Sequence, residues 1–532
     1  MALNNKVTVL MPDKGVTFQK KGDARYAYYA VRTYRNEKGQ PTCDRVSIGK
    51  VDDATGKLIP NRNYYEVFKK EPIAFTDTIV KCGTYGVFKE ISKTIGLDKA
   101  IKASFSEHYD EIMSAAHYML CGSSTMYLMD DWMEEHLTFN KTPMTSPAIS
   151  KMFEALSDNN ARTAFFKDWI KKRKEKELIA YDVTSISTYA RGIEDAEWGY
   201  NRDNEELPQI NYAMFYSQES QLPLYYRIYP GSINDKSHLE YMAEDTTMLD
   251  MKKAYFVMDR GFYTEDNLKY MVNEKGIRFM IPIPTSINYY GELIDKYKDK
   301  VVNNYSCLIG DGPYFGKKFE VNKYGFRMNV HIFYNPDKIS AEVISFKKRL
   351  VEMENSLTKM TVAPAKNSNY CKYFNITQKE NYLVFEKNED AINKELSRMG
   401  FFIIAETIFT LETEEALDTY RCRDTIEKCF DDLKNELDLK RMHCHVDQTS
   451  SGKMFTAFIA LVIRSYMQKK LKVYMREHCL SFQKIINELD RIKVIYAPAK
   501  PNGYRLLNPI TKTQREILQN LGVSEDFVDC LV

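Results

Sequence analysis

The segment from residue 176 to residue 284 alternates between short apolar runs and amphipathic stretches, and this alternation constrains the fold more than any other feature of the chain. The order is strand, strand pair, helix, strand, helix and strand, with predicted ranges 178–181, 209–216, 222–229, 237–251, 254–258, 264–273 and 277–284. Strands that alternate with helices in this way are typical of an α/β core built on a layered sheet.

Two aspartates directly follow buried strands of this core. Asp182 comes after Leu-Ile-Ala-Tyr, and Asp259 comes after Tyr-Phe-Val-Met. A carboxylate at such a place is held by a rigid sheet and faces its open edge. An aspartate after a strand most often serves as a turn or capping residue, so neither position alone assigns a function.

A third acid lies in a strongly charged segment, 414–437, which we predict to form one long helix. Four of its residues share one narrow stripe at about 100° per residue, namely Tyr420, Arg423, Glu427 and Lys434. A separate apolar stripe would pack on the core, namely Ile426, Leu433 and Leu437. We expect the remaining acids to be solvated, namely Asp424, Asp431 and Asp432. Taken alone, such a helix is more often a solvated face with ordinary ion pairs.

Three acids on two strands and a helix suit the cleavage and joining of phosphodiesters. Two metal ions about 3.5–4 Å apart can activate the nucleophile and stabilise the leaving oxygen. Hard ions such as Mg²⁺ bind carboxylate oxygens rather than thiols. We therefore predict that Asp182, Asp259 and Glu427 are catalytic and hold two Mg²⁺ ions, for which Mn²⁺ would substitute. The candidate contacts to DNA are Tyr420, Arg423, Lys434 and Arg260.

The helix spacing Tyr-(2)-Arg-(3)-Glu-(6)-Lys resembles the YREK signature of bacterial insertion-sequence transposases of the DDE class. The segments 181–185 and 259–263 resemble the first and second acid motifs of that group, and 207–210 and 229–232 resemble its strand-pair region. The resemblance covers about 178–284 and 400–465, with a weaker likeness in the N-terminal part.

This resemblance implies an α/β catalytic core of the RNase H-like type, a mixed five-stranded sheet with helices on both faces. In that fold the first acid ends the first strand, the second ends the fourth, and the Glu lies on a helix after the fifth. A β-rich insertion often separates the fifth strand from this helix. The implied activity is cut-and-paste transposition: a homodimer in a synaptic complex cuts the terminal inverted repeats of double-stranded DNA and joins the 3′-hydroxyl ends to target DNA.

The remaining patterns divide the chain into further segments. Residues 1–75 predict a small β-rich domain with strands at 27–34 and 43–51, and residues 76–175 predict a helical domain that is our candidate for DNA binding. The insertion, 285–400, separates the two parts of the core, 176–284 and 401–475, and the second part contains an apolar helix at 454–474. Residues 476–532 form a mixed C-terminal region, a candidate for dimerisation.

The charge of the chain does not itself point to DNA. Lys and Arg number 75 against 73 Asp and Glu, a formal charge of +2, so any basic surface must be local. The densest basic run, 167–176, is most simply a solvated helix face. Ten cysteines without a CxxC pair indicate a reducing compartment, and the sequence shows neither a signal-peptide core nor a run of about 18 apolar residues. We expect a cytoplasmic, nucleoid-associated protein without a membrane partner.

Two alternatives stay open. The first is an RNase H-like nuclease that cuts DNA without joining it. The second is a domesticated DNA-binding regulatory protein that no longer cuts, against which the complete set of three acids argues.

Overall fold

The computed structural model of the chain describes residues 8–22, 24–36, 38–53, 55–69, 78–122, 125–173, 178–233, 235–251, 254–365, 368–380, 382–496 and 504–530. None of the helices in these ranges is both long enough and apolar enough to cross a lipid bilayer.

The centre of the molecule is a mixed sheet in which five consecutive strands lie in the order β8-β7-β6-β9-β10. Their bounds are Leu178–Thr188 for β6, Gln209–Ser217 for β7, Pro223–Pro230 for β8, Tyr255–Met258 for β9 and Arg278–Pro282 for β10. β7 and β8 continue β6 as an antiparallel meander, whereas β9 pairs parallel with β6 and β10 pairs parallel with β9. The predicted α/β core is thus confirmed, and the arrangement is consistent with an RNase H-like sheet.

One boundary of this core was predicted wrongly. The first strand does not end at Tyr181, because β6 continues to Thr188. The residues after Asp182 are mostly β-branched and buried, and they pair with β7 as far as Ser187 opposite Gln209. Asp182 therefore lies inside a strand rather than after one.

Helices cover both faces of the sheet, as predicted. One face presents Tyr212, Met214 and Tyr226, and it packs against α15 (Asp424–Asp431) and α16 (Asp447–Glu477). The opposite face presents Tyr225 and Tyr229, which contact α8 (Asp235–Met248). Alternate residues of a strand point to opposite faces, so both faces are covered by apolar packing.

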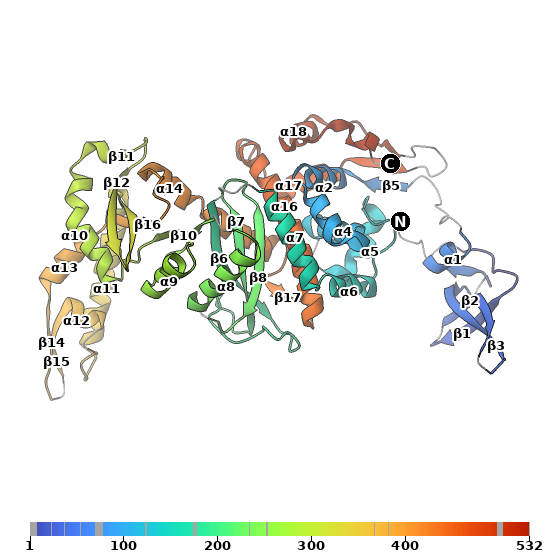
Figure 1. Cartoon of the computed structure of the whole chain (residues 1–532), viewed down its shortest axis with the longest axis horizontal. Helices are drawn as coiled ribbons and strands as arrows, with labels where there is room; N and C mark the ends of the chain where they lie inside the picture. Colours follow the sequence, from blue (N-terminus) through green and yellow to red (C-terminus); the bar gives the residue numbers. More distant parts are fainter. Residues whose placement is uncertain are drawn as a thin grey trace.

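The segment between β10 and α15 extends the same sheet instead of forming a separate one. β16 (Phe401–Glu406) pairs antiparallel with β10 on one side and with β13 (Phe326–Tyr334) on the other, and β12 (Tyr314–Lys323) and β11 (Leu308–Ile309) follow. Figure 1 shows these strands at one end of the molecule, beside α10 (Asn288–Val302).

A second, smaller core lies beyond this sheet extension. It is built from buried residues such as Phe346, Leu357 and Phe374. Its elements are α11 (Pro336–Leu357), α12 (Asn369–Tyr373), β14 (Phe374–Gln378), β15 (Leu383–Lys387) and α13 (Glu389–Leu396).

The helical segment near the N-terminus shares its core with the C-terminal part of the chain. The apolar helix predicted at 454–474 is α16, which is longer than predicted and packs against α4 (Tyr109–Cys121) and α6 (Ser146–Ala155). Gly452 allows this approach, since a Cβ there would meet the Phe153 carbonyl oxygen at 2.2 Å. β5 (Thr78–Lys81) pairs with β18 (Lys493–Tyr496), so the two ends of this region lie in one small sheet.

The other elements of that region complete the helical layer. They are α2 (Gly83–Thr94), α3 (Leu97–Ser104), α5 (Met129–Glu135), α7 (Asn159–Lys171), α17 (Phe482–Asp490), β19 (Tyr504–Leu506) and α18 (Lys512–Leu521).

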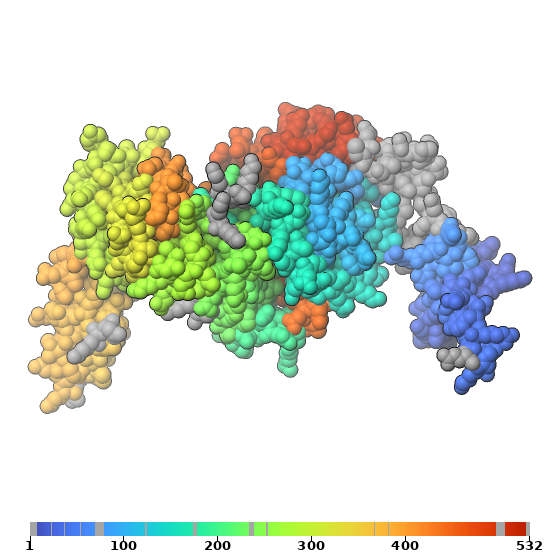
Figure 2. All heavy atoms as spheres, viewed as in Figure 1, coloured from blue at the N-terminus to red at the C-terminus, as the bar shows by residue number. Residues whose placement is uncertain are grey.

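The N-terminal sheet forms a separate module with its own core. It contains β1 (Val16–Lys21), β2 (Ala24–Arg35), β3 (Pro41–Val51), β4 (Leu58–Pro60) and α1 (Arg62–Val67). Its buried residues, such as Ala27, Ile48 and Tyr64, form a hydrophobic cluster of their own. The two strands predicted at 27–34 and 43–51 are confirmed as β2 and β3. Figure 2 shows this module, in blue, at one end of the molecule.

Candidate active site

Asp182 lies on the sheet face that α15 covers. It pairs directly with Met214 of β7, and the Met214 sulfur lies 3.8 Å from Cys429 Sγ of α15. Directly opposed residues of antiparallel strands point to the same face, so Asp182 also faces this helix. Its side chain is only 19% exposed, and its Oδ1 accepts a hydrogen bond of 2.8 Å from the Val183 backbone N–H.

Asp259 lies beside Asp182 because β6 and β9 run parallel. Their register places Tyr181 opposite Met258, and each aspartate is the next residue. Asp259 follows β9 directly and precedes the 3₁₀ turn Arg260–Phe262. Its side chain is 41% exposed, so it stands at the open side of the site.

The segment that carries Glu427 is not the single long helix that its sequence predicted. α14 (Thr413–Arg421) ends before Cys422, and α15 begins at Asp424. Across this break, Arg423, Thr425 and Ile426 donate backbone hydrogen bonds three rather than four residues back. The Thr425 hydroxyl also donates to the Cys422 carbonyl oxygen, a local bond that competes with regular helix.

Arg423 lies in this break and joins the three predicted acids. Its Nη1 lies 3.7 Å from Asp182 Oδ2 and 4.0 Å from Asp259 Oδ1, and its Nη2 lies 2.5 Å from Glu427 Oε1. The guanidinium is only 11% exposed, whereas Glu427 is 54% exposed. One buried cation thus draws together carboxylates from β6, β9 and α15.

Burial sets the protonation of the innermost acid. Removal from water raises the pKa of Asp182 to about 6, while the Val183 N–H and the Arg423 charge act in the opposite direction. Without a metal ion, this carboxyl takes up a proton near pH 6. A bound cation would have to displace that proton, so metal affinity here falls as the pH falls.

Tyr420 and Arg423 stay together despite the helix break. The Arg423 guanidinium carbon lies 5.7 Å from the centre of the Tyr420 ring, within cation–π range. The Nε of Arg423 is buried, and no hydrogen-bond partner for it lies within the described ranges. The Tyr420 ring therefore restrains the Arg423 guanidinium, whose Nε–H donates no hydrogen bond to the described residues.

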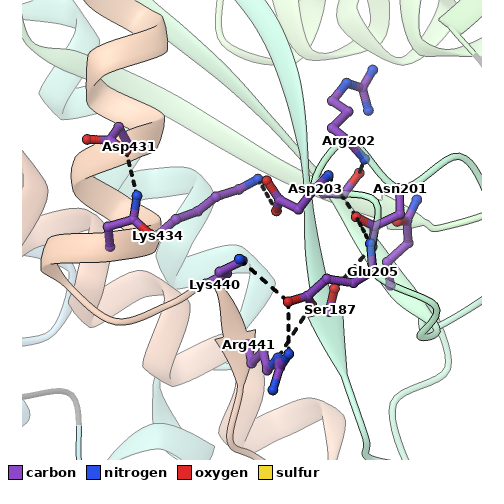
Figure 3. Close-up of polar contacts among 12 residues, drawn as sticks. Ser187, Asn201, Arg202, Asp203, Glu205, Asp431, Lys434, Lys440 and Arg441 are labelled. Carbon is purple, nitrogen blue, oxygen red and sulfur yellow. Dashed lines mark hydrogen bonds and ion pairs between the residues drawn. The ribbon is translucent and has the colours of Figure 1, made fainter.

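Lys434, the fourth residue of the stripe, is paired with an acid of the loop between β6 and β7. It belongs to a π turn, Asp432–Glu436, at the end of α15. Its Nζ lies 2.6 Å from Asp203 Oδ2, and the lysine side chain is only 9% exposed. Figure 3 shows Lys434 reaching Asp203, while Lys440 and Arg441 reach Glu205. Burial lowers the pKa of Lys434, and the Asp203 carboxylate opposes that change.

The structure also places Arg260, Asp432 and the predicted apolar stripe. Arg260 is exposed at the start of the turn after Asp259. Asp432 is not solvated, contrary to the prediction, since it is buried and its Oδ1 accepts a bond of 2.8 Å from Arg464 Nε of α16. The predicted apolar stripe is confirmed, and all its members are fully buried: Ile426, Leu433 and Leu437.

The carboxylate oxygens of this site fit hard divalent cations, although the three acids are not arranged as ligands around a common position. Asp182, Asp259 and Glu427 offer carboxylate oxygens, the ligands that Mg²⁺ and Mn²⁺ prefer. Within the part of the chain that the structure describes, no three His, Cys, Asp or Glu side chains are already arranged around a common metal position. The Arg423 guanidinium lies between the acids, so its positive charge and that of a metal ion would compete for them.

Two partners of this region were missed from the sequence. Asp203, the partner of Lys434, lies in an irregular loop between β6 and β7 whose path no periodicity reveals. Arg464, the partner of Asp432, did carry a signal. It directly follows the mostly apolar run Phe455 to Ile463 within the predicted core helix 454–474, and a charge buried there requires a partner.

Comparison with known proteins gives one informative match. No curated protein matches this chain. A cryo-EM structure of the piggyBac transposase synaptic complex with hairpin DNA is similar over 78% of this chain and 74% of that one, with a TM-score of 0.33 and 9% identity, a level that supports no inference. Residues 173–463 match the family described as "Transposase DDE domain", which is more than half of the chain. The match includes β6, β9 and α15, so this chain belongs to the DDE transposase family of phosphoryl-transfer enzymes.

Proposed function

We propose that this protein is a cut-and-paste transposase of the bacterial insertion-sequence type with the YREK signature. It would cleave double-stranded DNA at the terminal inverted repeats of its element and join the 3′-hydroxyl ends to target DNA. The observation that carries the proposal is the meeting of Asp182, Asp259 and Glu427 around Arg423. These residues come from three elements far apart in sequence, within the segment that matches the family.

Each residue then has a role set by its position. Asp182 and Asp259 are held by adjacent parallel strands, and Glu427 approaches from the helix that covers the same face. The chemistry that divalent ions supply at such carboxylates is activation of the attacking hydroxyl and stabilisation of the leaving oxygen. Before divalent ions bind, Arg423 partly compensates the negative charge of the acids. After they bind, its planar guanidinium suits a contact with a phosphate of the DNA.

The remaining candidate contacts lie around this centre. Tyr420 restrains Arg423 through its ring, and exposed Arg260 is available at the open side next to Asp259. Lys434 would reach a phosphate only after leaving Asp203, because the two are paired at 2.6 Å. We assign these three residues to DNA positioning rather than to the chemical step.

The decisive experiment uses conservative variants that remove one charge each. Asp182→Asn and Glu427→Gln should abolish cleavage and joining of a linear DNA that carries both flanking repeats, in Mg²⁺ or Mn²⁺. Both variants should still shift the same DNA in a gel. Asp424→Asn is the matched control, since Asp424 is an exposed acid on the same helix, and it should keep wild-type cleavage.

Three results would contradict the proposal in different ways. Normal cleavage by Glu427→Gln would show that the site is assigned to the wrong residues. Cleavage without joined product, when a supercoiled plasmid target is supplied, would favour a nuclease. DNA binding without any cleavage in either metal would favour a regulatory protein that no longer cuts.

A further inference from the structure

The near-neutral charge of the chain conceals one basic module. Residues 1–75 contain fourteen Lys and Arg against eight Asp and Glu, a formal charge of +6. Residues 76–175, the helical segment, contain thirteen against fourteen, a formal charge of −1. Affinity for nucleic acid rests largely on cations that meet phosphates, so the charge distribution favours the N-terminal module over the helical segment as the DNA reader.

Part of the β2–β3 hairpin of this module extends beyond the strands that flank it. β1 pairs with β2 only over Ala24–Tyr29, and β4 pairs with β3 only over Gly49–Val51. Apart from a bond from the Ala30 N–H to the Gly15 carbonyl oxygen, the hairpin continues beyond those pairings as two strands, from Ala30 opposite Arg45 to Arg35 opposite Pro41. We call this part, residues 30–36 and 38–45, the distal ribbon.

The distal ribbon has no core of its own. The buried hydrophobic residues of the module that lie on β2 and β3 are Ala27, Ile48 and Val51, all outside it. Within it, Val31 is 46% exposed and Tyr34 is 44% exposed. A two-stranded hairpin with both faces in water is only marginally stable, so this ribbon is the kind of element that a partner surface completes.

The ribbon is also equipped for a polyanion. Arg32 and Arg45 are exposed, one on each strand. Arg32 lies over the Tyr34 ring at 5.8 Å, and the Tyr34 hydroxyl donates to Asp44 at 3.3 Å. Arg45 contacts Cys43 on the same strand. These contacts hold the cations extended along the ribbon without burying them.

We propose that the distal ribbon enters the major groove of duplex DNA and is the element that reads the ends of the transposon. Two strands about 4.8 Å apart, with their side chains, fit a major groove about 12 Å wide. A ribbon of six residues at about 3.3 Å each is long enough to follow the groove past several base pairs. This inference rests on the proposed function for the identity of the DNA, and it replaces the helical segment as the DNA-binding element.

The test compares two double variants of the full-length protein with equal loss of charge. Arg32→Gln/Arg45→Gln changes the distal ribbon. Lys167→Gln/Lys171→Gln changes exposed lysines of α7, in the densest basic run, of which residues 174–176 lie outside the described ranges. Binding is measured by fluorescence anisotropy at several salt concentrations. The probes are a 40-bp duplex from the DNA flanking the gene, a scrambled duplex and its single strand.

The ribbon variant should bind the flanking duplex at least roughly tenfold more weakly, and the slope of log affinity against log salt should fall by about 2. Its preference for the flanking over the scrambled duplex should shrink, whereas the α7 variant should stay within about twofold of wild type on both measures. All four positions are exposed, so unchanged melting curves will show that the fold is intact.

The opposite outcomes are equally clear. A loss of affinity in the α7 variant alone, or equal losses in both, would overturn the inference. So would a wild-type preference for the single strand. Wild-type cleavage together with unaffected binding by the ribbon variant would reject the ribbon and leave the proposed function standing. Absence of cleavage by the wild type would reject the proposed function itself.

Discussion

Replacing Arg423 with Gln should tighten the binding of divalent ions, although it removes a conspicuous residue of the site. The reason is that one guanidinium now pairs with all three carboxylates that a metal ion would use. A metal ion must overcome both this pairing and the repulsion of the positive charge. Without Arg423, the acids are left uncompensated and the metal-free protein loses stability.

The geometry sets the size of the effect. Two unit charges 3.7 Å apart, as Arg423 and Asp182 are, interact by about 4–5 kcal/mol at an effective dielectric constant near 20. The pairs with Asp259 and Glu427 are more exposed and add no more than about 1 kcal/mol each. Desolvation of the guanidinium offsets part of this sum. A net change of about 2 kcal/mol remains, which corresponds to roughly thirtyfold in metal affinity.

The measurement is calorimetric titration with Mn²⁺ at pH 8, above the pKa of Asp182, supported by melting curves in EDTA and in Mn²⁺. Arg423→Gln should melt at a lower temperature in EDTA and should gain more from Mn²⁺ than the wild type does. The control is Arg421→Gln, which removes the same charge from an exposed position two residues away. It should leave both quantities nearly unchanged.

A weaker or unchanged metal affinity in Arg423→Gln would refute this reasoning. Arg423 would then act chiefly by holding Glu427 in place, and the acids would not meet a cation in the arrangement described here. An equal effect of Arg421→Gln would show that the overall charge matters and not the contact.

Three further predictions concern stability. Burial lowers the pKa of His117 to about 3, below its ordinary value, so the folded protein binds fewer protons than the unfolded chain as the pH falls below about 6.5. The free energy of unfolding should therefore fall by up to about 1.4 kcal/mol per pH unit between pH 6 and pH 4, and His117→Phe should remove this component in urea titrations. Asp203→Asn leaves the Lys434 ammonium without its anion and should cost about 1–3 kcal/mol in the same assay; an unchanged midpoint would count against that pair. Trp169→Ala removes a fully buried indole that donates to the Pro223 carbonyl oxygen at 3.0 Å, and it should cost about 3–5 kcal/mol, with Trp169→Phe costing less.

The sequence predicts the central sheet well because local pattern and tertiary position agree there. The strands from β7 to β10 are short, apolar and bounded by turn residues. The Thr264 side chain caps the helix between β9 and β10, as expected, by accepting a hydrogen bond from the Asn267 N–H. The adjacency of Asp182 and Asp259 follows from parallel pairing. These features need only the strand period and the order of elements.

The errors arise where a tertiary contact overrides the local pattern. A regular helical wheel cannot show the break at Cys422 or the π turn at Asp432–Glu436, both of which interrupt the single regular helix that the stripe assumes. The pairing of Asp203 with Lys434 joins residues more than two hundred positions apart. Charge counts for the whole chain likewise hide the basic N-terminal module, which becomes visible when residues 1–75 are counted separately.

The continuation of the sheet beyond β10 has a practical consequence for engineering. β16 reads Phe-Phe-Ile-Ile-Ala-Glu and is almost wholly buried between β10 and β13. A truncation of 285–400 would strip one side of that strand and leave an apolar backbone edge, the kind of template on which chains polymerise. In the intact molecule the outer edge of the sheet is formed instead by β12, which carries lysines, and by the two-residue β11. The inserted segment therefore covers an apolar strand edge. Minimal versions of this enzyme should keep β11 to β13 even if the outlying helices are removed.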